Sequence, residues 1–144
     1  LRMKQHCQNA EKVVNFLKKH KEVTKVIYST EHDKQIANRA KQYLRGGNGP
    51  MVGIELKGGI EAGKKFIESL KMFYHVANIG DARSLAIHPA STTHSQLNEK
   101  ELVASGVTQS YVRLCIGLEH IDDIIDDLDQ ALNKSSKGKL KAVS

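Results

Sequence analysis

Apolar residues recur with a helical period near both ends of the chain. Steps of three and four residues place such positions on one side of a helix, so the pattern predicts a helix at each end. The stripe near the N-terminus comprises Met3, Cys7, Ala10, Val14 and Leu17. The stripe near the C-terminus comprises Ile121, Ile124, Ile125, Leu128 and Leu132.

Strand-like and helical patterns alternate between these two ends. β-branched, aromatic or alternating apolar residues predict strands at 23–28, 51–57 and 112–116, and a short one near 85–87. Helices are expected up to residue 44, over 60–72, and after Asn98, where Glu101 completes a capping-box pattern. The glycines of 46–49 separate a helix from a strand, which is the wrong order for a phosphate-binding loop.

This order of elements predicts an α+β fold of two layers. We expect a small mixed or antiparallel sheet with helices on one face. The final helix begins with Asp122, Asp123, Asp126 and Asp127, where negative charge suits the positive end of the helix dipole.

The composition is typical of one globular domain of 144 residues, with 40% hydrophobic and 26% charged residues. We find no signal-peptide pattern and no apolar run long enough to span a bilayer, so we expect a cytoplasmic protein without a membrane segment. Cys7 and Cys115 are expected as free thiols. The chain begins with Leu1 and enters a helical pattern at once, which hints at a piece of a longer protein.

The net charge of +6 raises the question of nucleic-acid binding. The basic residues are spread along the chain, and aromatic residues make up only 5%, which leaves little to stack on bases. Residues 134–144 carry four lysines and no acid, and we expect them to form a basic flexible tail. We therefore expect no nucleic-acid partner.

Arg113 is the first candidate for chemistry. In the strand at 112–116, Val112 and Leu114 share the apolar face, so Arg113 points the other way, where its planar fork could hold a carboxylate or simply be solvated. Asn78 opens a loop and is typical of a turn. The histidines and cysteines show no metal-ligand spacing, and Ser91 with His94 lacks an elbow motif and an orienting acid.

Three blocks of the chain resemble a known family. They are RMKQHCQNAEKVVNFL, LKGGIEAGKKFIESLKMFYHVANIGDARSLAIHPASTTHSQL and VRLCIGLEHIDDIIDDLDQAL. They are similar to the C-terminal domain of fold-type I pyridoxal-phosphate (PLP) enzymes of cysteine and methionine metabolism, closest to the O-acetylhomoserine sulfhydrylases. The resemblance implies that residues 1–133 are a C-terminal substrate-binding domain.

The resemblance also implies roles for three residues. Arg113 would bind the α-carboxylate of an amino-acid substrate, Asn78 would contact the same carboxylate, and Thr93 would lie near the substrate. Many lyases and cystathionine synthases of the family have serine where this chain has Asn78, so asparagine favours the sulfhydrylase branch. A lyase or cystathionine synthase domain, or a standalone binding module, stays open as an alternative.

The parent enzyme implied by the resemblance makes L-homocysteine and acetate from O-acetyl-L-homoserine and sulfide, in methionine biosynthesis. Its cofactor would be pyridoxal 5'-phosphate, held by a large N-terminal domain, because no lysine of this chain matches the family's cofactor motif. The resemblance further implies a homotetrameric parent. This chain alone is expected to be inactive, with no catalytic, cofactor-binding or metal-binding residue of its own.

Overall fold

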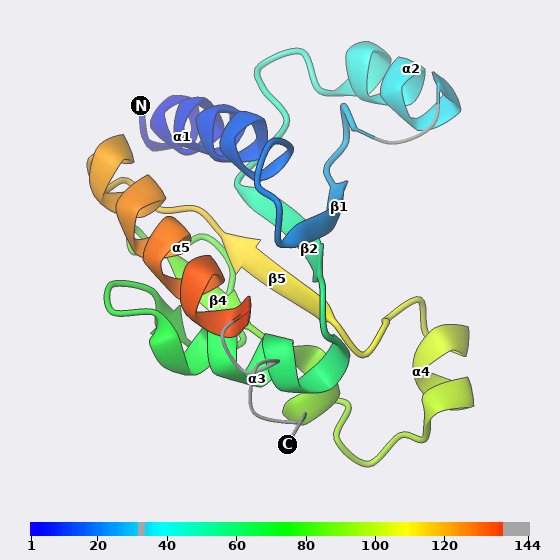
Figure 1. Ribbon diagram of the computed structural model, residues 1–144. Coiled ribbons are helices and arrows are strands. Elements are labelled where there is room, and N and C mark those ends of the chain that lie inside the picture. The colour runs from blue at the N-terminus through cyan, green and yellow to red at the C-terminus, as the bar shows by residue number, and fades with distance from the viewer. Residues whose placement is uncertain (32–33, 137–144) are drawn as a thin grey trace.

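The computed structural model describes residues 1–31 and 34–136. Two α-helices of sixteen residues, α1 and α5, begin and end this part of the chain (Figure 1). In chain order the elements are α1 (Arg2–Leu17), β1 (Val23–Ile27), α2 (Lys34–Tyr43), β2 (Met51–Leu56), α3 (Gly59–Ser69), β3 (Tyr74–His75), β4 (Leu85–Ile87), the 3-10 turn η1 (Pro89–Ser91), α4 (Glu99–Ala104), β5 (Tyr111–Cys115) and α5 (Ile121–Ser136).

The sheet has five strands in the order β1-β2-β5-β4-β3. β1 pairs with β2, β2 with β5, and β5 with β4, all antiparallel, whereas β3 runs parallel to β4. The sheet is therefore mixed, as expected. The short edge strand β3 is absent from the sequence-based prediction, because two residues are too few to show a period.

The three longest helices, α1, α3 and α5, cover one face of the sheet and form the core with it (Figure 1). Alternate residues of β2 and β5 point into this core, as the sequence predicts: Val52, Ile54, Leu56, Val112 and Leu114 are at most 3% exposed. The helices contribute residues at helical spacing. They include Ala10, Val14 and Leu17 of α1, Phe66 and Ile67 of α3, and Ile124, Leu128 and Leu132 of α5.

A group of polar contacts holds the segment after β5. The carboxylate of Glu119 accepts hydrogen bonds from the backbone N–H (2.7 Å) and the hydroxyl (2.9 Å) of Ser84. The Ser84 hydroxyl oxygen accepts from the N–H of Gly117 (2.9 Å). From α1, Asn9 donates to the carbonyls of Gly117 and Glu119, and the Nδ1–H of His6 donates to the carbonyl of Ile116 (2.6 Å). These bonds fix the end of β5 against α1 and against the start of β4.

The structure corrects the predicted extent of α3. The helix begins at Gly59 and ends at Ser69 rather than at 72, because Leu70 is already extended (ψ 138°). The carboxylate of Asp127 accepts from the backbone N–H groups of Lys71 and Met72 at 2.8–3.1 Å. Asp127 is 7% exposed, so it holds this turn rather than acting only on the dipole of its own helix.

One further expectation meets a different outcome near the N-terminal end of the chain. Met3 is 57% exposed and lies outside the buried stripe of α1. The expected domain boundary at 133 falls inside α5, which continues to Ser136 with Ser135 buried. The rest of the expected tail, 137–144, lies outside the described residues. The capping box at Asn98 and Glu101 is confirmed, with both reciprocal hydrogen bonds present.

Candidate functional site

Arg113 lies in the middle of β5, on the face of the sheet opposite the core. Its neighbours Val112 and Leu114 are completely buried, while Arg113 is half-buried. Across the sheet, Arg113 pairs with Gly53 on one side and Ile87 on the other. The alternation read from the sequence therefore places the guanidinium on the face that α1, α3 and α5 leave open.

A hollow of about 260 Å³ opens beside Arg113 on this face. Arg113 is the only charged residue among those described that line it. Two polar neighbours are already engaged, since the hydroxyl of Tyr28 donates to the carbonyl of Gly49 (2.8 Å) and that of Ser29 donates to Asn48 (2.9 Å). The complete lining is Ile27, Tyr28, Ser29, Asn48, Met51, Val52, Gly53, Tyr111 and Arg113.

The guanidinium of Arg113 has no hydrogen-bonded or ion-paired acceptor within residues 1–31 and 34–136. A half-buried arginine gains most from an acceptor that matches its planar fork, and a carboxylate does so bidentately. The hollow can therefore receive a small anion, with Arg113 as its charged partner.

Asn78 lies in the exposed loop that follows β3. Its side-chain oxygen accepts from the N–H of Ile79 (2.9 Å), which leaves the amide nitrogen available as a donor. β3 runs parallel to β4 with His75 opposite Ala86, and β4 pairs Ile87 with Arg113. The loop thus begins about 10 Å from the Arg113 strand, two strand spacings away. Within the described chain no hydrogen bond joins Asn78 to Arg113.

Thr93 is exposed and follows η1, which packs beside β5. Its hydroxyl pairs with the Nδ1 of His94 (2.8 Å). Ser91 is paired with His88 rather than with His94. His88 is completely buried and its second ring nitrogen faces the carbonyl of Gln109 (2.8 Å). No described carboxylate is hydrogen-bonded to its ring, so this pair is structural.

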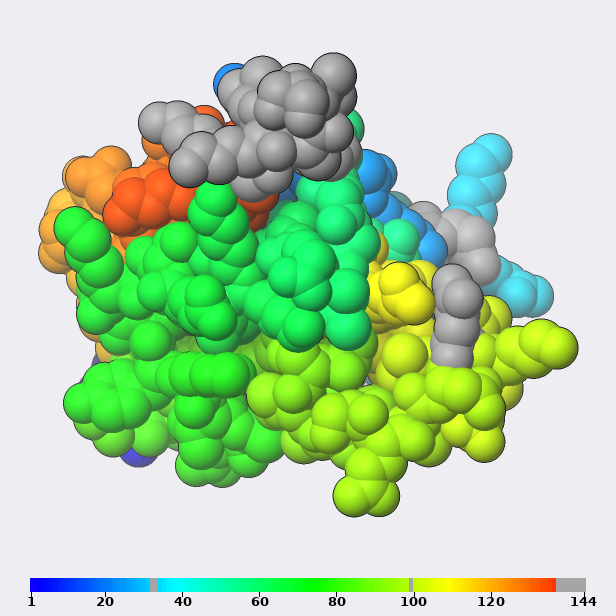
Figure 2. All heavy atoms as spheres, turned by 60° about the horizontal axis from the view of Figure 1, so that its bottom comes forward, coloured from blue at the N-terminus to red at the C-terminus, as the bar shows by residue number. Residues whose placement is uncertain are grey.

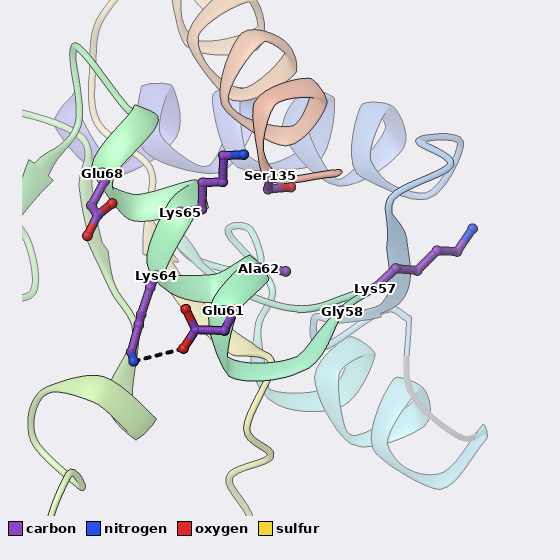
Figure 3. Close-up of a pocket in the computed structure, with 8 residues that line it drawn as sticks. All are labelled: Lys57, Gly58, Glu61, Ala62, Lys64, Lys65, Glu68 and Ser135. Carbon is purple, nitrogen blue, oxygen red and sulfur yellow. Dashed lines mark hydrogen bonds and ion pairs between the residues drawn. The ribbon is translucent and has the colours of Figure 1, made fainter. Parts of the chain in front are cut away.

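A larger hollow of about 500 Å³ lies over α3, near the end of α5 (Figure 3). Its charges do not converge on one point. Lys64 is turned to Glu61, at 2.9 Å, while Lys57 points away from the other side chains. Lys65 points toward Ser135 instead. The hollow beside Arg113 is therefore the better candidate site, because its single charge is free of such pairing.

An apolar groove of about 260 Å³ lies on α2 and continues the open face. Ser29 lines both this groove and the hollow beside Arg113. Tyr43 and Leu44 are 71% and 44% exposed there. α2 protrudes from the rest of the chain in two views, whereas α3 packs beside η1 (Figures 1 and 2). Large apolar side chains on a protruding helix indicate a contact surface.

No group of histidine, cysteine, aspartate or glutamate residues in the described ranges could hold a metal ion. The described lysines do not line the hollow beside Arg113, so these residues do not by themselves fit a covalently held cofactor. Both cysteines are free and buried, as expected. A helix long and apolar enough to cross a membrane is likewise not found in the described ranges.

Comparison with known proteins gives a consistent picture. The family model for Cys/Met metabolism PLP-dependent enzymes matches residues 1–133. The chain is 53% identical over 133 residues to an O-acetyl-L-homoserine sulfhydrylase of Leptospira meyeri, covering 92% of this chain and 30% of that protein. It is 43% identical over 137 residues to an L-methionine γ-lyase of Fusobacterium nucleatum subsp. polymorphum, covering 93% and 34%.

The fold comparison agrees. A crystal structure described as an O-acetylhomoserine (thiol)-lyase of Campylobacter jejuni, with an N'-pyridoxyl-lysine-5'-monophosphate, superposes with a TM-score of 0.83 at 43% identity. The alignment covers 92% of this chain and 31% of that one. The chain belongs to the Cys/Met metabolism PLP-dependent enzyme family. It spans about a third of the length of the curated relatives that it matches.

Proposed function

We propose that this chain is the C-terminal substrate-binding domain, residues 1–133, of a larger PLP-dependent O-acetylhomoserine sulfhydrylase. The complete enzyme would make L-homocysteine and acetate from O-acetyl-L-homoserine and sulfide, as a step of methionine biosynthesis in the cytoplasm. The observation that carries the proposal is Arg113, a guanidinium without a described acceptor in an otherwise uncharged hollow. The 53% identity to a sulfhydrylase supports the branch.

In this proposal Arg113 grips the substrate carboxylate with its fork. The hydrogen bonds among Glu119, Ser84 and Gly117 hold the end of β5 in place, so the strand position from which Arg113 extends is fixed before the substrate arrives. A fixed carboxylate orients the rest of a small amino acid, and such positioning lowers the barrier of the reaction that follows. Asn78 would add a second contact from its loop, and Thr93 would approach from the η1 side.

The remaining partners follow from the same proposal. A large N-terminal domain would hold pyridoxal 5'-phosphate, which supplies an electron sink when bound. That domain would also cover the open face of the sheet. Support comes from the apolar groove on α2, which is continuous with the Arg113 hollow through Ser29. We further propose a homotetrameric parent and no nucleic-acid partner.

A second candidate from the same family is a methionine γ-lyase or cystathionine synthase. The 43% identity to an L-methionine γ-lyase favours it. Asn78 disfavours it, because the family resemblance implies serine at this position in many lyases and cystathionine synthases.

One set of assays separates the branches. The full-length enzyme is given O-acetyl-L-homoserine with sulfide, with methanethiol or with cysteine, and L-methionine alone. The proposal expects homocysteine formation with sulfide to have the highest kcat/KM. Faster release of methanethiol from methionine would identify a lyase, and preferred formation of cystathionine would identify a synthase.

A further inference from the structure

Tyr111 leans toward Arg113 across the open face of the sheet. In the register it pairs with Glu55, but its ring lies over Gly53, the direct partner of Arg113. A Cβ atom added to Gly53 would lie 2.7 Å from Cε2 and 2.9 Å from the hydroxyl oxygen of Tyr111. Only glycine leaves room for the ring there, and the hydroxyl is thereby brought into the row of residues that contains Arg113.

The hydroxyl of Tyr111 is available as a donor. Within the part of the chain that the structure describes it has no hydrogen-bond partner, unlike that of Tyr28, which is bonded to Gly49. Burial raises the pKa of Tyr111 above its ordinary value of 10.0, and the charge of Arg113 opposes this with a smaller effect. The side chain therefore stays a neutral phenol, able to donate, throughout the physiological pH range.

We propose that Tyr111 is a second donor to the carboxylate that Arg113 binds, and that Gly53 is the residue that makes this possible. The inference rests on the proposed function and deepens it by naming another substrate-binding residue. A carboxylate has about four acceptor positions, so the fork of Arg113 leaves at least one for a phenol. The ligand class is thus a small molecule with a free carboxylate.

The test is Tyr111→Phe in the full-length enzyme, because it removes the hydroxyl and keeps the ring. We expect KM for the amino-acid substrate to rise about tenfold, with kcat within about twofold, as for a lost hydrogen bond to a charged group. Bound cofactor should not change. Tyr74→Phe, an exposed tyrosine on β3, is the matched control and should leave both constants unchanged.

A pair of inhibitors separates binding from packing. With an unreactive α-amino acid, Tyr111→Phe should raise the inhibition constant about tenfold, whereas with its neutral carboxamide the constant should change less than about twofold. Gly53→Ala should displace the ring and raise KM in the same direction. In the Tyr111→Phe background, Gly53→Ala should raise KM by less than it does in the wild-type background, because the hydroxyl is already absent.

The outcomes separate this inference from the proposed function. If KM is unchanged in Tyr111→Phe while Arg113→Ala loses activity, the role of Tyr111 is wrong and the proposed function stands. Equal changes for the acid and the carboxamide would mean that the residue acts only through packing, which overturns the inference. Normal kinetics for Arg113→Ala would overturn both.

Discussion

His88 shows how a single buried side chain can make stability depend on pH. Its Nε2–H donates to the carbonyl of Gln109, and its Nδ1 accepts from the hydroxyl of Ser91, both at 2.8 Å. α3 approaches the ring so closely that a Cβ on Gly63 would lie within 2.6 Å of Cδ2. The neutral ring is thus hydrogen-bonded at both of its nitrogens inside the protein.

Burial lowers the pKa of His88 below its ordinary value of 6.5, an effect that the hydrogen bond to Gln109 opposes. Lys64 and His75 also disfavour the charged form, whereas Glu61 favours it. As pH falls through 6.5, the unfolded chain takes up a proton that the folded chain refuses, so the free energy of unfolding falls until the lower, folded pKa is reached. Above pH 6.5 the contribution to stability is complete.

We therefore expect the unfolding free energy to drop as pH is lowered from about 7.5 to about 5.5, with at most about 1.4 kcal/mol per pH unit arising from this one proton. His88→Gln should flatten that slope, whatever its own stability. His120→Gln is the control, because its side chain is 70% exposed. Urea denaturation at several pH values measures the slopes, and equal slopes for the wild type and His88→Gln would contradict the explanation.

At the scale of elements, the turn between α3 and β3 depends on α5. Asp127 accepts the N–H groups of Lys71 and Met72, and the amide of Gln130 bridges Asp127 (3.0 Å) and the carbonyl of Ser69 (2.6 Å). One carboxylate and one amide thus join two helices at the point where α3 ends. The contact also orients the start of β3, and so the loop that carries Asn78.

Asp127→Ala should lower the free energy of unfolding by about 2–4 kcal/mol, because it leaves the backbone N–H groups of residues 71–73 without their acceptor. Asp126→Ala is the matched control: it removes the same group from the same helix at an exposed position and should change stability by less than about 0.5 kcal/mol. Urea denaturation of both variants gives the comparison. Similar losses of unfolding free energy in both variants would show that the negative charge at the start of α5 matters, and not the contact of Asp127 with the turn after α3.

The sequence predicts elements well where many residues share one period, as in α5 or in the alternation of β2 and β5. It fails where a distant partner decides the outcome. Asp127 and Asp126 are equivalent by sequence, and only the position of the 71–73 backbone makes one of them an acceptor. Met3 fits the stripe of α1, yet the helix extends past the core there.

The difference between local sequence patterns and partners distant in sequence also applies to the site. The alternation in β5 is enough to place Arg113 on the open face, because the face of a strand is a local property. The neighbourhood of Tyr111 and Gly53 depends on strand register, which pairs Gly53 with Arg113, 60 positions away, and has no signal in a single sequence. The carboxylate role of Asn78 and Thr93 stays a prediction, since both are exposed and bonded only to their immediate neighbours.

At the scale of the whole molecule, the two sides of the sheet differ. One side is filled by α1, α3 and α5, and the other holds Arg113, its hollow and the apolar groove of α2. A groove with exposed Tyr43 and Leu44, joined through Ser29 to the hollow of a half-buried arginine, is expected to be covered in a larger protein.

This coverage can be measured by covalent footprinting. Tyr43 should react readily in the isolated chain and be protected severalfold in the full-length enzyme, because the large domain would bury apolar surface there.

The isolated chain should still fold, because its core is formed by its own helices and strands. It should show no visible cofactor band that borohydride fixes to one lysine when pyridoxal 5'-phosphate is added. Equal reactivity of Tyr43 in both proteins would contradict the proposal that a large domain covers this surface. A cofactor band fixed to one lysine of the isolated chain would contradict the proposal that the large domain holds the cofactor.

The central claim is that Arg113 holds the substrate carboxylate, and kinetics of Arg113→Ala in the full-length enzyme test it most directly. A charge-assisted bidentate contact contributes about 1.5–3 kcal/mol, and misorientation adds to the loss, so kcat/KM for O-acetyl-L-homoserine should fall at least about a hundredfold while pyridoxal 5'-phosphate stays bound. Arg113→Lys should recover only part of the lost kcat/KM, and Asn78→Ser should lower kcat/KM by less than Arg113→Ala does. Near-normal kcat/KM for Arg113→Ala would show that the carboxylate is held elsewhere.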